Sequence, residues 1–87
     1  MEIELSEDAE EHLLYFKKSG QVDILKKIRL LFESMQENPI EGIGKPEALK
    51  HNLSGFWSRR INREHRILYK IFDETIYIFS LKGHYNS

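Results

Sequence analysis

Hydrophobic and polar residues alternate at the start of the chain. Ile3 and Leu5 alternate with Glu2 and Glu4, a pattern that is typical of a short β-strand. Ser6 is a good N-cap, and the acidic residues that follow it suit the positive end of a helix dipole. The pattern therefore predicts a strand and then a helix that begins after Ser6.

Two stretches with helical periodicity come next. Ala9, Leu13 and Phe16 fall on one face of the first helix, and Gly20 is suited to end that helix in the left-handed conformation. A second helix is predicted from about residue 22 to about residue 37, where a proline follows and prevents its continuation. Its apolar stripe consists of Ile24, Leu25, Ile28, Leu31, Phe32 and Met35. We expect the two helices to form an antiparallel hairpin with one shared apolar face.

The second half of the chain is predicted to be a loop followed by strands. Residues 38–55 are rich in Gly, Pro and charged residues, which predicts a loop with a short turn. The strands are expected at about 56–61, 65–72 and 75–82, with turns between them. The element order β-α-α-β-β-β predicts an α+β fold in which the helical hairpin packs on one face of an antiparallel sheet. The whole chain, 1–87, is expected to form one domain.

The turn between the first two of these strands decides which side chains share a face of the sheet. Arg60 and Arg66 are six residues apart, so a three-residue turn places them opposite one another on the same face. Ile67, Tyr69 and Ile71 then point to the other face, towards the helices. The open face is predicted to carry Ser58, Arg60, Arg66 and Lys70, and clustered cations on an open face suit a phosphate.

Composition narrows the classes of protein that the sequence could encode. The hydrophobic content of 40% and the aromatic content of 11% are typical of a globular domain. The chain has no cysteine, which excludes disulfides and thiolate metal sites. It has no apolar run of membrane-spanning length and no signal-like start, so we expect a soluble, cytoplasmic protein without membrane contact.

Charge is unevenly distributed along the chain. Residues 1–41 carry five Lys and Arg against ten Asp and Glu, a net charge of −5, whereas residues 42–87 carry eight against four, a net charge of +4. Two interpretations remain open at this point. The second part meets an anion such as a nucleic acid, or the two parts complement one another within the fold.

One set of residues in the second part fits a known kind of RNA cleavage. RNA is cut without a metal when its 2′-hydroxyl attacks the neighbouring phosphate, which requires a base, an acid and cations. Glu47 suits the base, His84 suits the acid, and Lys50, Arg60 and Arg66 supply the cations. The spacing of these residues alone is weak evidence for a nuclease, because a Glu, a His and two Arg occur in most domains of this size.

The remaining aromatic and histidine residues allow more than one interpretation. Tyr85 and Trp57 could stack on bases of single-stranded RNA, although Trp57 is as well suited to pack against the loop. His51 is expected to be a structural hydrogen-bonding residue rather than a catalytic one, His65 a turn or surface residue, and His12 a helix residue that is partly buried or solvated. Their spacing matches no metal motif, so no metal and no cofactor is expected.

The run of residues 42–61, followed by Glu-His-Arg at 64–66 and His-Tyr at 84–85, resembles the YoeB (Txe) family of toxin–antitoxin toxins within the RelE-like group. The resemblance covers essentially the whole chain. It implies a ribosome-dependent mRNA interferase, an endoribonuclease that cuts messenger RNA in the ribosomal A site. It also implies a cognate antitoxin of the YefM or Axe type that holds the toxin inactive.

The resemblance also implies roles for individual residues. The family pattern places a general base at Glu47, a general acid at His84, a transition-state contact at Arg66, phosphate contacts at Lys50 and Arg60, and a substrate-orienting aromatic at Tyr85. Members of the family commonly stop at the His-Tyr pair, whereas this chain continues for two residues.

Two other classes of function have to be compared with the nuclease. A non-catalytic module that only binds the ribosome or an antitoxin would not need Glu47, Arg66, His84 and Tyr85 together. A DNA-binding repressor would need a reading helix, and both predicted helices are committed to the core. The sequence leaves open the codon preference, the identity of the antitoxin, and whether the free protein is a monomer or a homodimer.

Overall fold

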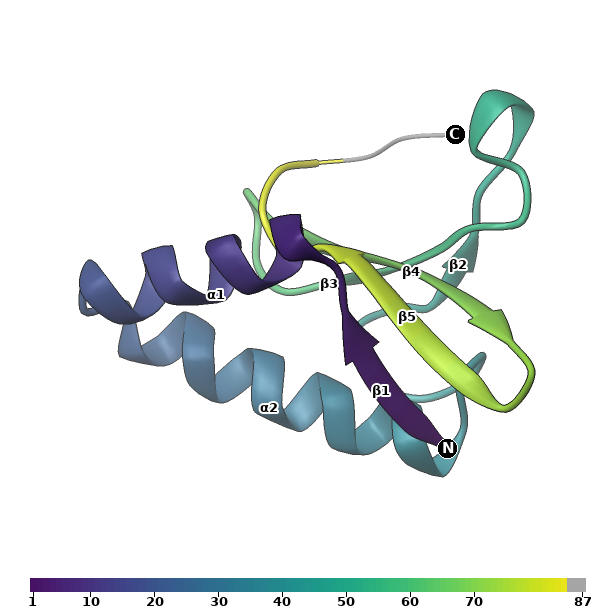
Figure 1. Ribbon diagram of the computed structural model, residues 1–87, viewed down its shortest axis with the longest axis horizontal. Helices are drawn as coiled ribbons and strands as arrows, with labels where there is room; N and C mark the ends of the chain where they lie inside the picture. Colours follow the sequence, from purple (N-terminus) through teal and green to yellow (C-terminus); the bar gives the residue numbers. More distant parts are fainter. Residues whose placement is uncertain (85–87) are drawn as a thin grey trace.

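The computed structural model describes residues 1–84, and its elements pack as one layer of helices against one sheet (Figure 1). The elements are, in chain order, β1 (Glu2–Leu5), α1 (Glu7–Lys18), α2 (Val22–Glu37), β2 (Glu47–Ala48), the short 3₁₀ helix η1 (His51–Leu53), β3 (Trp57–Arg60), β4 (Arg66–Phe72) and β5 (Thr75–Ser80). The predicted α+β class and the predicted helical hairpin are confirmed.

The helix ends follow the predicted signals. Ser6 has an extended backbone, and its side chain accepts a hydrogen bond from the N–H of Ala9 over 3.1 Å. This bond satisfies one of the free donors of the first turn of α1. Gly20 follows α1 with a φ of +67°, a conformation that glycine adopts without a steric penalty. The second helix, α2, has the predicted bounds.

The sheet has the strand order β1-β5-β4-β3-β2, and its β1–β5 pair is parallel. The predicted antiparallel pairing holds from β2 to β5, and the parallel β1–β5 pair makes the sheet mixed. The helical hairpin carries the chain from β1 to the opposite edge, where β2 forms. From there, strands β2 to β5 form an antiparallel meander back across the sheet. Its last strand, β5, runs parallel to β1. The two-residue strand β2 lies in the stretch that was predicted to be a loop.

One apolar cluster fills the space between the helices and the sheet. Its buried members are Ala9, Phe16, Ile28, Leu31, Met35, Ile61, Ile67, Tyr69, Ile76, Ile78 and Leu81. Ile71 is half-buried against the cluster, so the predicted helix-side face of β4 is confirmed. Because the helices cover this face, the other face of β3 and β4 is left for polar side chains.

Candidate active site

The strand register brings four predicted residues to one face of the sheet. Arg60 pairs with Arg66, and Ser58 pairs with Leu68. Glu47, in β2, pairs with the other side of Ser58. Paired residues of neighbouring antiparallel strands share a face, so Glu47, Ser58, Arg60 and Arg66 all lie on the face opposite the helices. The predicted pairing of the two arginines is confirmed.

Arg66 is the most constrained cation of this face. Its Nη1 donates a hydrogen bond to Ser58 Oγ over 3.2 Å. Its Nε is buried, and within residues 1–84 it is the buried side-chain nitrogen or oxygen that has no hydrogen-bond partner. A buried donor without a partner is energetically unfavourable. An anion that accepted a hydrogen bond from this nitrogen would remove that cost.

Arg60 lies beside Arg66 and is held by the preceding loop and the following turn. Its backbone N–H donates to the Gly44 carbonyl over 2.7 Å, and its side-chain Nε donates to the Asn62 carbonyl over 3.3 Å. The side chain of Asn62 closes the turn by accepting from the N–H groups of Glu64 and His65 over 2.9 Å and 2.8 Å. Two arginines are thus paired across neighbouring strands of the open face, and two positive charges on one face suit a phosphate.

His84 reaches the same end of the sheet through the backbone of its neighbour. The N–H of Arg66, the first residue of β4, donates to the Gly83 carbonyl over 2.8 Å. His84 therefore directly follows a residue that is hydrogen-bonded to β4. The His84 side chain is exposed. Tyr85, the predicted substrate-orienting aromatic, lies outside the described residues.

The position of Glu47 depends on Arg59, which follows Ser58 in β3 and therefore points to the face opposite to Arg60. Arg59 is fully buried on the helix side of β3. Its guanidinium donates to Tyr69 Oη (3.1 Å), Ser34 Oγ (2.9 Å) and the carbonyls of Ile43 (3.1 Å), Asn38 (2.7 Å) and Glu41 (2.9 Å). These acceptors are uncharged. The bonds fasten the loop before β2 to the sheet, and this loop carries the chain to Glu47.

Tyr69 completes the Arg59 network from β4. Its hydroxyl accepts from Arg59 and donates to the Pro39 carbonyl over 2.8 Å. Burial raises the pKa of Tyr69 above its ordinary value of 10.0, and the hydrogen bond and positive charge of Arg59 act in the opposite direction. The phenol therefore remains protonated at neutral pH and able to donate to the loop.

Three predicted contacts lie apart from the paired arginines. Lys50 is exposed, just before η1. Lys70 lies further along the open face of β4, where its Nζ is 5.1 Å from the centre of the Phe56 ring. Trp57 pairs with Tyr69 and packs half-buried against the core on the helix side. The register does not bring Trp57 together with Glu47 and the arginines, so the geometry favours its packing role over stacking on RNA.

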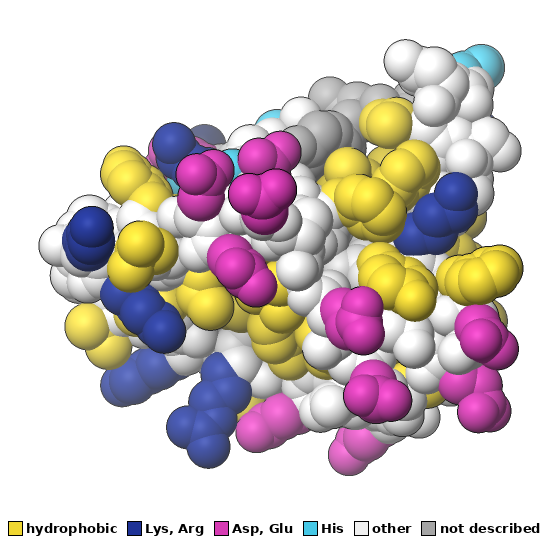
Figure 2. Space-filling model, in the orientation of Figure 1, with side chains coloured by type: hydrophobic (Ala, Val, Ile, Leu, Met, Phe, Trp, Pro, Cys, Tyr) yellow, Lys and Arg dark blue, Asp and Glu magenta, His cyan; other side chains and the backbone are white. Residues whose placement is uncertain are grey.

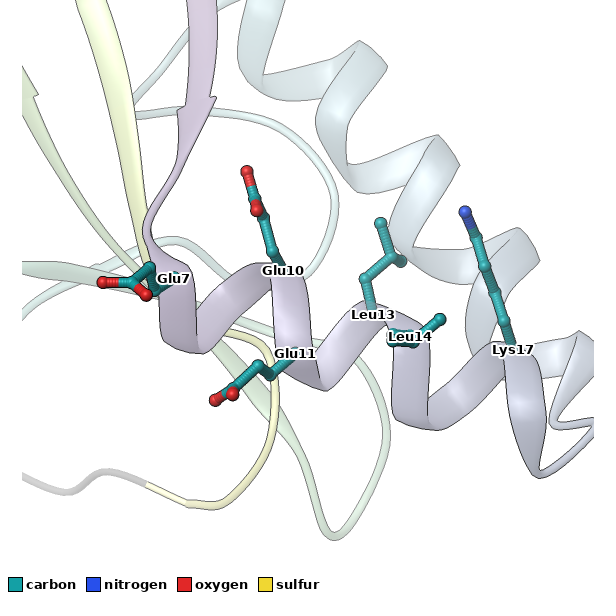
Figure 3. A pocket seen from close by; sticks show the side chains of 6 residues that line it. All are labelled: Glu7, Glu10, Glu11, Leu13, Leu14 and Lys17. Carbon is teal, nitrogen blue, oxygen red and sulfur yellow. The ribbon is translucent and has the colours of Figure 1, made fainter.

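The pocket on α1 does not suit a phosphate. A shallow pocket on α1 is lined by Glu7, Glu10, Glu11, Leu13, Leu14 and Lys17 (Figure 3). The lining holds three carboxylates and a single ammonium group, a balance of charge that disfavours an anion. Within residues 1–84, no group of three His, Asp or Glu side chains is placed to hold a metal ion, and no helix is long and apolar enough to cross a membrane.

The chain as a whole matches a family of known proteins. Residues 5–85 match a family described as the YoeB-like toxin of bacterial type II toxin–antitoxin systems. The chain is 45% identical to the toxin YoeB of Escherichia coli (strain K12) over 85 residues, which cover 98% of this chain and 100% of that protein.

Solved structures agree with the sequence comparison. A YoeB/ParE toxin from Agrobacterium tumefaciens is similar with a TM-score of 0.92 and 28% identity, over 98% of this chain and 100% of that one. YoeB of Staphylococcus aureus is 46% identical over 98% of both chains, with TM-scores of 0.86 in a heterotetrameric complex with YefM and 0.87 as a dimer.

Proposed function

The chain belongs to the YoeB-like toxins of bacterial type II toxin–antitoxin systems, and from this premise we propose that it is a ribosome-dependent endoribonuclease that cleaves messenger RNA and so inhibits translation. Residues 1–87 act as one domain, in the cytoplasm. The observation that carries the proposal is the pairing of Arg60 with Arg66 on the face that also carries Glu47, with His84 attached next to the Arg66 backbone.

The proposed reaction uses the 2′-hydroxyl of the RNA as its nucleophile. Glu47 takes the proton of this hydroxyl, and the oxygen attacks the neighbouring phosphorus. The bond from phosphorus to the 5′-oxygen then breaks, and His84 gives a proton to that oxygen. The products are a 2′,3′-cyclic phosphate and a 5′-hydroxyl, and the chemistry requires neither metal nor cofactor.

Cations stabilise the charge that builds up on the phosphate in this reaction. Arg66 is assigned to the transition state, because its buried Nε has no protein partner among residues 1–84 and a fixed donor costs little reorganisation during the reaction. Arg60 and the exposed Lys50 contribute positive charge around the phosphate. Tyr85 is assigned to orient the substrate, as the family resemblance implies.

A cognate antitoxin of the YefM or Axe type is the proposed protein partner, and the ribosome is the site of action. The Staphylococcus aureus relative forms a complex with YefM and is also found as a dimer. An acidic segment that is disordered when free would complement the paired arginines. We extend the antitoxin partner and the homodimer to this chain by its 46% identity with that relative.

Primer extension in a translation extract, with and without ribosomes, tests the proposal. We expect cleavage of the message that depends on ribosomes and leaves a cyclic phosphate and a 5′-hydroxyl. Ribosome binding without cleavage would support the binding-module alternative. At high protein concentration on naked RNA, EDTA should leave the chemical step unchanged. A 5′-phosphate product would exclude the mechanism, because it requires attack by an activated water.

A further inference from the structure

Two histidines outside the candidate active site hold the chain just before His84. The backbone N–H of Leu81 donates a hydrogen bond to His12 Nδ1 over 3.2 Å. The backbone N–H of Gly83 donates to His65 Nδ1 over 3.0 Å. His12 lies on α1 and His65 directly precedes β4, so the two rings hold the segment from two different elements.

The direction of these bonds fixes the chemical state of both rings. A backbone N–H can only donate, so each Nδ1 must offer a lone pair. The neutral imidazole with its proton on Nε2 meets this requirement, whereas the imidazolium ion, which is protonated on both nitrogens, does not. Both hydrogen bonds therefore require the ring form that leaves Nδ1 free to accept.

Further contacts leave the segment little freedom to move. Ser80 Oγ donates to the Lys82 carbonyl over 2.9 Å, and Lys82 Nζ lies 4.4 Å from the centre of the Tyr15 ring on α1. The Gly83 carbonyl accepts from Arg66, as described above. Because α1 and β4 both hold the segment, a shift of its backbone would break contacts on two sides.

The His65 ring is itself held in place by the core. It packs edge-on against Phe16, with 5.2 Å between the ring centres, and Phe16 is fully buried. Sequence reasoning had assigned His65 to a turn or the surface. The turn position is correct, but the half-buried ring has a specific partner in Gly83.

We propose that His12 and His65 are positioning residues for the cleavage reaction. Each accepts a hydrogen bond on Nδ1, from the N–H of Leu81 or of Gly83. These bonds fix the backbone just before His84 and so place its side chain near the phosphate beside Arg66. The inference rests on the proposed role of His84 as the acid. Neither His12 nor His65 touches the substrate.

The first test reads the two hydrogen bonds directly, without activity. The full chain carrying Glu47→Ala, which lacks the proposed base and so does not stop its own translation, is labelled with ¹⁵N-histidine, and the side-chain nitrogen spectrum identifies the tautomers. We expect His12 and His65 to be neutral with the proton on Nε2, and the Leu81 and Gly83 amides to be protected from hydrogen exchange. A proton on Nδ1 of either ring, or unprotected amides, would overturn the proposal.

Matched substitutions then separate the acceptor from the bulk of the ring. His12→Leu should speed exchange at the Leu81 amide on the order of tenfold, and His65→Leu should do the same at Gly83. His12→Asn and His65→Asn keep an oxygen acceptor at the δ position and should retain most of the protection. If a leucine variant does not fold, the asparagine variant at the same position still tests the acceptor role. Loss of amide protection in a folded asparagine variant would contradict that role.

The second test measures cleavage by these variants in the translation extract. Misplacement of His84 should lower kcat about 10- to 100-fold in the leucine variants, with KM for ribosomes unchanged, and the asparagine variants should recover most of the rate. His51→Asn removes an exposed histidine and serves as the control. Unchanged kcat in a leucine variant whose amide exchange has become fast would overturn the positioning role.

The two tests also separate this inference from the proposed function. If the unmutated chain cleaves no message, both the nuclease and the positioning role fail. The tautomers and the exchange rates then still decide whether the two histidines hold the segment.

Discussion

Arg66 differs from the other open-face cations because its Nε is buried without a partner among residues 1–84. We predict that Arg66→Ala nearly abolishes cleavage, as do Glu47→Ala and His84→Gln, with losses of about 10²–10⁴-fold in rate. Ribosome binding should persist, because these groups act on the transition state. Single-turnover cleavage and ribosome co-sedimentation measure the two effects.

The control for this prediction is a cation outside the site. Arg63 is exposed in the turn before β4, and Arg63→Ala should retain cleavage. Lys50→Ala and Arg60→Ala should lose less rate than Arg66→Ala, because neighbouring cations share the phosphate charge. Equal losses in all four variants would contradict the division of roles and point to a general electrostatic effect.

Arg59 provides a second prediction at the residue scale, this time on stability. Arg59→Met removes five hydrogen bonds and leaves partly buried acceptors without their donor, so it should lower the free energy of unfolding by about 2–4 kcal/mol. Arg29, on α2, is exposed, and its Nε lies 3.6 Å from Glu33 Oε2. Arg29→Met should cost less than about 0.5 kcal/mol.

Urea denaturation of both variants measures this difference. Equal stability of the Arg59 and Arg29 variants would show that water replaces the lost donors and that the loop needs no cation. The sequence could place Arg59 opposite to Arg60, because side chains alternate along a strand. Its acceptors could not be predicted, because they lie on a loop and on α2, which only the folded chain brings together.

At the scale of elements, local patterns predict the helices and long strands better than they predict strand pairing. The bounds of α2 and the pairing of Arg60 with Arg66 follow from periodicity and turn length. Strand β2 has two residues, too few to show an alternation. The partner of β1 is β5, more than 70 residues away, and neither the partner nor its direction is encoded in the pattern of residues 2–5.

At Gly44, the loop before β2 lies close to α2 and β3. A Cβ atom at Gly44 would lie 2.5 Å from Leu31 Cδ2 and 3.2 Å from the Arg60 carbonyl, at a φ of +84°. Gly20 has a φ of +67° with nothing within 4 Å. We predict that Gly20→Ala costs about 1 kcal/mol of stability through backbone strain alone, whereas Gly44→Ala costs at least about twice that.

Thermal unfolding of the two alanine variants gives the comparison, and cleavage should fall in the Gly44 variant because the loop leads to Glu47. Similar melting temperatures for both variants would mean that the loop moves away from Leu31 without cost. The positioning of Glu47 would then not depend on this close approach.

At the scale of the whole molecule, acidic and basic side chains gather on different parts of the surface. Acidic side chains follow Ser6 in the first turn of α1, and Lys17 and Lys18 lie in its last turn. Figure 2 shows acidic side chains around β1 and the start of α1, and cations at the hairpin end of the helices. The net charges of −5 and +4 were therefore too coarse to locate the site, because the acidic part also carries a cationic end.

The last prediction concerns the chain in a bacterial cell. We expect expression of the unmutated chain alone to arrest growth and protein synthesis, because cleaved messages cannot be translated to their ends. Coexpression of a cognate antitoxin should restore growth, since an acidic segment bound over the paired arginines blocks RNA. Glu47→Ala, which keeps the cationic face and loses the base, is the matched control and should be tolerated without the antitoxin. Pulse labelling of new protein measures the arrest. Normal growth with the unmutated chain present in folded form would contradict both the nuclease and the need for a partner. Arrest by the Glu47 variant at equal abundance would instead show that occupation of the ribosome, and not cleavage, stops translation.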